Sequence, residues 1–309
     1  MLVFLELILG LLILIVGGEL LVKGAVNFAR YFQVSPLIIG LTIVSFGTSA
    51  PELLVSLRAA MMDSPQMAIG NVVGSNIANL ALVLGATVLI SPIKINKSKL
   101  FLNWSVMLVA TLLFVVFSVT EAVLAFWEGC ILFSALIVFL LYSFFYGTNE
   151  NDQFEEESSK SDLLISLLLF LPFGAFGLNY GAGLLIDSAK TIALTVLHIS
   201  ESVVAVTIVA FGTSLPELVA SCVAAYRNQP GLSIGNLIGS NIFNLLAVLG
   251  LTSIVIPVAI YDSFFSFDVY WLLAITLLIG PILFFSKKIG RIIGVLLFAF
   301  YLAYILFVL

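Results

Sequence analysis

The stretch GTSAPELLVS at residues 47–56 occurs a second time, as GTSLPELVAS at residues 212–221. Each copy is followed by a segment rich in glycine and asparagine, GNVVGSNIANLALVLG at 70–85 and GNLIGSNIFNLLAVLG at 235–250, with 11 of 16 positions identical. The offset between the copies is 165 residues throughout, and no gap is needed. This duplication predicts a protein built from two structurally related halves.

Each copy places one glutamate, Glu52 or Glu217, inside a long apolar segment. An ionisable group at such a place is costly, and its default interpretation is functional. A structural carboxyl that burial keeps protonated is the simpler alternative. Two such glutamates related by an internal repeat favour a transporter with a cation site where the repeats meet.

The composition places the chain in a membrane. Of its 309 residues, 62% are hydrophobic and only 9% are charged, whereas soluble domains carry about a quarter charged residues. Apolar segments of about 20 residues, the length that crosses a bilayer, recur along the chain. They predict an all-α integral membrane protein with ten transmembrane helices, near residues 2–22, 36–60, 68–90, 100–119, 123–146, 162–184, 200–225, 233–256, 267–285 and 290–308.

The basic residues predict the orientation of these helices. If the N-terminus is outside, ten of the twelve lysines and arginines fall in cytoplasmic loops, and only Arg58 and Lys190 fall outside. Basic residues concentrate on the cytoplasmic side, so we expect both termini outside. Five spans in each half is an odd number, so the second half enters the membrane from the opposite face. The repeats are then inverted.

The predicted halves are residues 1–146 and 162–309, joined by a linker at 147–161. The sequence around the linker, GTNENDQFEEESSKSD at 147–162, is polar and acidic. It is typical of a flexible, solvated tether on the cytoplasmic side. Cation binding by its carboxylates is the alternative, but the spaced ligands of a calcium loop are missing.

The repeated motif contains the oxygen ligands of a cation site. Ser45, Thr48 and Glu52 share one stripe of a helix. Pro51 interrupts that helix and leaves a carbonyl near Gly47 without its usual donor, which is tolerated inside a membrane only where the carbonyl finds a partner or lines a cavity. Carbonyl, hydroxyl and carboxylate oxygens are the ligands that Ca²⁺ takes. The second copy supplies the matching set: Ala210, Gly212, Thr213, Ser214, Pro216 and Glu217.

The second part of the motif adds shorter polar side chains. Ser75 and Asn79 lie one helical turn apart, and Gly70 and Gly74 form a small-residue pair that lets helix backbones approach closely. We expect this approach to bring the hydroxyl and the amide beside Glu52. Hydrogen bonding between helices without an ion is the alternative for the serines. The second copy repeats the arrangement with Gly235, Gly239, Ser240 and Asn244.

Two carboxylates give the site a charge of at most −2, which one Ca²⁺ or two Na⁺ neutralise. Unbalanced charge is costly to desolvate. We therefore expect the empty site to hold a proton on one glutamate, with the pair titrating as a unit.

The two motif pairs resemble the alpha repeats of the cation/calcium antiporter superfamily, especially the prokaryotic sodium/calcium exchangers. The resemblance covers essentially the whole chain and implies two inverted five-helix halves. It also implies that the first and sixth helices are long, tilted and mobile against the other eight. It implies a calcium site built from Thr48, Glu52, Thr213 and Glu217. Sodium ligation is implied for Ser49, Ser75, Ser214 and Ser240, with the carbonyls of Ser45 and Ala210.

One position departs from the resemblance. The better-known exchangers have asparagine where Asn79 stands and aspartate where Asn244 stands, and this chain has asparagine at both. An amide replaces a protonated acid closely in shape. The change nevertheless places a three-sodium stoichiometry, and sodium coupling itself, in doubt.

We therefore expect an antiporter of the cytoplasmic membrane that exchanges Ca²⁺ for Na⁺, with the lipid bilayer as its surroundings. H⁺ in place of Na⁺, or K⁺ transported alongside, are alternatives, and a cation channel is a different class. An intramembrane enzyme is disfavoured, because the sequence has one histidine and no cluster of cysteine and histidine residues that would bind a metal. We expect no cofactor and no nucleic acid, and a monomer is sufficient.

Overall fold

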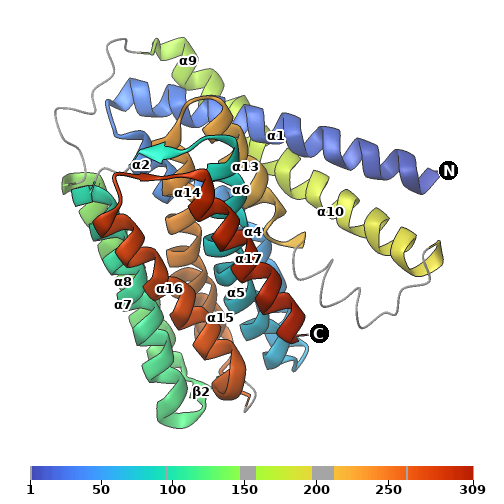
Figure 1. Cartoon of the computed structure of the whole chain (residues 1–309), viewed down its shortest axis with the longest axis vertical. Helices are drawn as coiled ribbons and strands as arrows, with labels where there is room; N and C mark the ends of the chain where they lie inside the picture. The colour runs from blue at the N-terminus through green and yellow to red at the C-terminus, as the bar shows by residue number, and fades with distance from the viewer. Residues whose placement is uncertain (1, 95–96, 147–157, 197–211, 262–263, 309) are drawn as a thin grey trace.

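Figure 1 shows the computed structural model of the chain, which describes residues 2–94, 97–146, 158–196, 212–261 and 264–308. Nearly all of these residues are helical. Helix α1 (Leu2–Phe32) and helix α10 (Leu171–Thr195) lie side by side and run obliquely to the bundle that the other long helices form (Figure 1). The molecule thus consists of a helix pair laid across a bundle.

Five π-helical turns in the described residues are labelled η. The first half contains, after α1, these elements: α2 (Pro36–Ile39), η1 (Gly40–Val44), α3 (Ser45–Thr48), α4 (Ala50–Met61), α5 (Pro65–Ala78), η2 (Asn79–Val83), α6 (Leu84–Ile90), β1 (Ile93–Lys94), α7 (Lys97–Glu121), β2 (Val123–Leu124) and α8 (Phe126–Tyr146). A third such turn, η4 (Ser166–Phe170), follows α9 (Lys160–Ile165) in the second half and leads into α10.

The remaining elements of the second half repeat this order. They are α13 (Leu215–Tyr226), α14 (Pro230–Phe243), η6 (Asn244–Val248), α15 (Leu249–Val255), β3 (Val258–Ala259), η7 (Phe264–Asp268), α16 (Val269–Phe285), β4 (Lys288–Ile289) and α17 (Arg291–Val308). The turn η7 is a further π-helical segment, at the start of α16.

The structure confirms a multi-pass membrane protein. In the described part of the chain, six helices are long and apolar enough to cross a membrane, and the pair Pro36–Thr48 and Ala50–Met61, bent by 45°, makes up to seven. Three shorter apolar helices, α13, α16 and α17, lie where the sequence predicts further spans. The total of ten crossings and the outside location of both termini remain predictions.

Two predicted boundaries differ from the observed ones. The first and sixth spans were expected to end near 22 and 184, but α1 continues to Phe32 and α10 to Thr195. An oblique helix needs more residues than an upright one to cross a hydrocarbon core of about 30 Å.

The linker ends at Ser159, whose hydroxyl and backbone form a capping box with Asp162 at the start of α9. Residues 147–157 of the predicted linker lie outside the described residues.

Two small antiparallel sheets extend the repeat beyond the motifs. β1 pairs with β4, with Ile93 opposite Ile289, and β2 pairs with β3, with Leu124 opposite Val258. The offset of 165 residues turns the first pair into the second, because it relates Ile93 to Val258 and Leu124 to Ile289. This exchange of partners is what a two-fold axis between the halves requires.

The apolar core has two parts, one inside the bundle and one beneath the α1–α10 pair. One cluster of buried side chains fills the bundle of α5 to α8 and α14 to α17, and a second joins α1 and α10 to α2 and α13. Within the helix pair, glycines allow backbone contact. A Cβ on Gly174 would lie 2.5 Å from the Leu21 nitrogen, and a Cβ on Gly17 would lie 2.5 Å from the Leu178 nitrogen. The pair can therefore act as one body against the bundle.

A candidate cation site between the two halves

The site is built on two helix breaks that have the same geometry. Ser49 has φ −87° and ψ 5°, and Ser214 has φ −85° and ψ 4°, both outside the helical region. Pro51 and Pro216 follow in the first turn of α4 and α13, and Glu52 and Glu217 lie in the same turns. The same local sequence therefore places one carboxylate at the same point of each half, and both are fully buried.

Two π-helical turns position the asparagines. η2 begins at Asn79 and η6 begins at Asn244, at corresponding positions of the repeat. A π-turn re-aims side chains and is frequent at functional sites. Both asparagines are fully buried, and the Asn244 amide donates to Asn76 Oδ1 at 3.3 Å.

Each half meets the other through a pair of hydroxyl groups. Thr48 Oγ1 lies 3.3 Å from Ser240 Oγ, and Thr213 Oγ1 lies 3.3 Å from Ser75 Oγ. The two contacts are equivalent, because Thr48 corresponds to Thr213 and Ser75 corresponds to Ser240 at the offset of 165 residues. The broken helix of one half therefore lies against the glycine-rich helix of the other half at both places.

The carboxylates do not follow this symmetry. Ser49 donates to Glu217 Oε1 at 3.1 Å. The corresponding Ser214 hydroxyl is buried without a partner among the described residues, as are both oxygens of Glu52. Glu52 and Glu217 lie close enough to interact electrostatically. The two halves thus hold one shared centre in two different local arrangements.

Unpaired oxygen atoms make this centre suited to a cation. Buried polar atoms in proteins are almost always hydrogen-bonded. Here, besides the groups just named, atoms of the four central asparagines lack partners among the described residues: Asn76 Nδ2, Asn79 Oδ1 and Nδ2, Asn241 Oδ1 and Asn244 Oδ1; so does Glu217 Oε2. Among the described residues, no three His, Cys, Asp or Glu side chains are grouped so that they could hold a metal ion together. Carboxylate, hydroxyl and amide oxygens fit a hard cation such as Ca²⁺.

The structure brings most of the predicted ligands to this centre. Those that lie there, buried except for the half-buried Thr213, are Ser45, Thr48, Ser49, Glu52, Ser75, Asn79, Thr213, Ser214, Glu217, Ser240 and Asn244. Ala210 lies outside the described residues. No ion identifies which of them are ligands, so their individual roles stay predictions.

The glycines act across the halves, which differs from the expectation. A Cβ on Gly235 would lie against the Leu37 carbonyl oxygen and 3.1 Å from Gly40 Cα, so α14 contacts the broken helix of the first half. A Cβ on Gly239 would meet the Ser45 hydroxyl. For Gly70 and Gly74, the corresponding partner segment falls at 202–206, outside the described residues.

Four asparagines at this centre were not singled out as ligands from sequence: Asn76, Asn179, Asn236 and Asn241. Asn236 Oδ1 accepts from Thr48 Oγ1 at 3.1 Å, while its amide donates to Ser221 at 2.9 Å. Asn76 faces Asn244 as described above. Asn179 on α10 donates to the Gly47 carbonyl at 3.3 Å. A polar amide inside an apolar span was the signal that could have identified Asn179.

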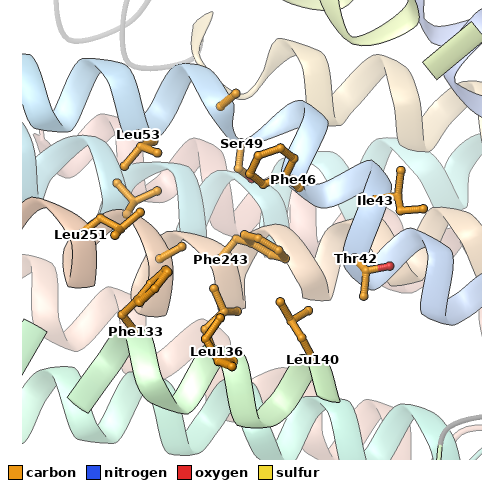
Figure 2. Close-up of a pocket in the computed structure, with 14 residues that line it drawn as sticks. Thr42, Ile43, Phe46, Ser49, Leu53, Phe133, Leu136, Leu140, Phe243 and Leu251 are labelled. Atoms are coloured by element: carbon orange, nitrogen blue, oxygen red, sulfur yellow. The ribbon is translucent and has the colours of Figure 1, made fainter. Parts of the chain in front are cut away.

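An apolar cavity of about 490 Å³ lies beside the helix break (Figure 2). Phe46 and Ser49 line it from the broken helix, Phe133 and Leu136 from α8, and Phe243 from α14. Its walls are almost entirely hydrocarbon, which cannot replace the hydration shell of an ion. The cavity is therefore a poor ion path, but it leaves room beside the break for the helix to bend.

The fold and the site define a class, the membrane transporters that exchange cations. The chain belongs to the sodium/calcium exchanger family, because the family described as "Sodium/calcium exchanger protein" matches residues 2–145 and 166–309. The two matched segments correspond closely to the two predicted halves. This family consists of transporters, so the comparisons support cation/Ca²⁺ exchange by a multi-pass membrane protein.

Relatives match over nearly the whole chain. An uncharacterized membrane protein of Methanocaldococcus jannaschii is 38% identical over 302 residues, covering 96% of this chain and 94% of that protein. The sodium/calcium exchanger MaX1 of Methanosarcina acetivorans is 32% identical over 347 residues, with 98% and 97% covered. Among solved structures, the sodium-calcium exchanger NCX_Mj has a TM-score of 0.84 at 36% identity, with 97% of each chain covered.

Proposed function

We propose that this protein is an antiporter that carries Ca²⁺ out of the cytoplasm in exchange for external Na⁺, by alternating access. The observation that supports this most is the meeting of Glu52 and Glu217, fully buried and contributed by opposite halves, among oxygen atoms without partners. The names of MaX1 and NCX_Mj also favour sodium and calcium as the ions.

The same carboxylates serve both ions. Ca²⁺ binds to Thr48, Glu52, Thr213 and Glu217. Na⁺ binds to hydroxyls around them, from Ser49, Ser75, Ser214 and Ser240, with the Ser45 and Ala210 carbonyls and the Asn79 and Asn244 amides. Because both sets share the glutamates, one ion excludes the other. An occupied site is neutral and can change its access, whereas an empty, charged site cannot do so without a large cost, and this enforces exchange.

The α1–α10 pair changes the access to the site. It packs on itself through backbone contacts at glycines. It meets α13 through side chains, where a Cβ on Gly18 would lie 3.0 Å from Val219 and 3.3 Å from Val223. Sliding of this pair past the two helix breaks would open the site to one face of the membrane at a time. This role rests on the layered packing of the two apolar clusters.

The decisive experiment is Ca²⁺ flux in proteoliposomes under separately imposed Na⁺, K⁺ and pH gradients. We expect an outward Na⁺ gradient to drive Ca²⁺ uptake at constant pH and without K⁺. Uptake driven only by a pH gradient, or only when K⁺ is present, would assign another coupling ion. Flux that runs without any counter-ion would overturn exchange and indicate a channel.

The site also predicts the net charge moved in each cycle. With asparagine at both 79 and 244, the described site holds two acids, and a charge of −2 is neutralised by one Ca²⁺ or by two Na⁺. We expect electroneutral exchange, in which a membrane potential of either sign leaves Ca²⁺ uptake unchanged. Voltage-dependent uptake, or a reversal potential that fits three Na⁺, would contradict this charge balance.

A further inference from the structure

Asn179 connects the helix pair to the ion-binding motif. Its amide nitrogen donates to the Ala175 carbonyl of α10 at 2.8 Å and to the Gly47 carbonyl at 3.3 Å. The Gly47 carbonyl is the one left without a helical donor by Pro51, since proline has no N–H. Asn179 thus supplies from α10 the hydrogen bond that the broken helix lacks.

Among the described residues, the other half shows no such contact. The position that corresponds to Asn179 in α1 is Leu14, which is 1% exposed and has no hydrogen-bonding group. The corresponding Gly212 has an equivalent neighbour at a much shorter distance, because a Cβ there would lie 2.5 Å from Cγ1 of Ile186, which corresponds to Leu21. A Cβ on Gly47 would instead lie 3.5 Å from Ala175 and 3.9 Å from Leu21. The helix pair therefore lies unequally against the two breaks.

The asymmetry has an energetic consequence in an inverted repeat. If both halves had the same sequence, the two access states would be related by the two-fold axis and would have equal free energy. Each half would then adopt, in one state, the arrangement that the other half has in the other state. Differences between the halves therefore set which state is preferred. Asn179 opposite Leu14 is such a difference, and it lies where the moving pair meets a freed carbonyl.

We propose that Asn179 is a positioning residue that biases the exchanger toward the access state seen here, by satisfying the Gly47 carbonyl only in that state. The inference rests on alternating access, as in the proposed function. In the opposite state the Gly47 carbonyl loses this donor, and Leu14 offers none to Gly212.

The test uses three variants: Asn179→Leu, Leu14→Asn and the double variant that moves the amide to the other half. The readout is the apparent Ca²⁺ affinity at each face of oriented proteoliposomes, since the affinity at one face scales with the fraction of carriers that face it. We expect Asn179→Leu to shift the ratio of the two affinities by about tenfold, or about 1.4 kcal/mol. Leu14→Asn should shift it in the same direction, and the double variant furthest.

A structural role alone would not change this ratio, because a loosened fold weakens both faces together. Thr191→Val is the matched control, since the Thr191 hydroxyl bonds only to Asp187 of its own helix, at 2.8 Å. An unchanged ratio in folded Asn179→Leu, or opposite shifts in the two single variants, would overturn the proposal. If Asn179→Leu does not fold, Leu14→Asn alone decides. Failure of wild-type Ca²⁺ flux would instead refute the proposed function.

Discussion

Glu52→Gln and Glu217→Gln should each reduce Na⁺-driven Ca²⁺ uptake by at least about 100-fold. Glutamine keeps the shape of the side chain but leaves the site with one carboxylate, so a bound Ca²⁺ carries an unbalanced charge. Such a charge costs several kcal/mol inside a protein, and about 3 kcal/mol already corresponds to more than a hundredfold change in binding. Both carboxylates are fully buried, so water cannot compensate for the loss.

Glu128→Gln provides the matched control for these variants. Glu128 is also fully buried, but its oxygens accept hydrogen bonds from Thr120 Oγ1 at 3.2 Å and from the Ala125 nitrogen at 2.8 Å. It caps the start of α8 and is not part of the ion-binding centre. We expect this variant to lose some thermal stability and to keep its Ca²⁺ flux. Flux near the wild-type level in Glu52→Gln and Glu217→Gln would refute the assignment of the site.

The sequence predicted the parts of the site that depend on local residues. Identical residues at an offset of 165 gave Ser49 and Ser214 the same backbone geometry and gave Thr48 and Thr213 equivalent contacts. The helix breaks, the buried glutamates and the family could therefore all be predicted. Local sequence is sufficient there because proline and its freed carbonyl act within one helical turn.

The asymmetry of the site could not be predicted in this way. Ser49 donates a hydrogen bond to Glu217. The corresponding pair, Ser214 and Glu52, consists of the same residue types but makes no such bond in the described structure. Identical motif residues cannot by themselves specify unequal contacts, so the difference arises from residues outside the motif. We attribute it to the position of the α1–α10 pair, which results from packing between distant segments.

The long-range ion pair of Glu19 also could not be predicted from local sequence. The four-residue spacing of Glu19 and Lys23 on one helix predicts a local ion pair. The structure instead places Glu19 against Arg227, with Oε2 at 2.7 Å from Nη2 and 2.9 Å from Nε, while Lys23 lies over the ring of Phe170 at 4.7 Å. A guanidinium can donate two hydrogen bonds to one carboxylate, which an ammonium cannot do with the same geometry. The partners are separated by 208 residues, so no local sequence pattern indicates the pair.

Gly235→Ala should have the second-largest effect, because it separates the two halves at the site. The added methyl group would lie against the Leu37 carbonyl oxygen and 3.1 Å from Gly40 Cα. Backbone on that side cannot rotate away as a side chain can, so α14 must move from the broken helix. The Thr48 hydroxyl, at 3.1 Å from Asn236 Oδ1 and 3.3 Å from Ser240, would then lose both of its partners in the second half.

Overpacking of this kind costs about 1–3 kcal/mol of stability, and Ca²⁺ ligands must also stay within about 2.3–2.6 Å of the ion. We therefore expect a Ca²⁺ affinity at least about tenfold weaker, with a smaller Ca²⁺-induced rise in Tm. Gly231→Ala on the same helix is the control, since its methyl group would lie 3.5 Å from the Leu37 nitrogen, an ordinary contact. Equal Ca²⁺ affinity in both variants would mean that the site does not depend on backbone contact between the halves, and would leave the glutamates as its only shared element.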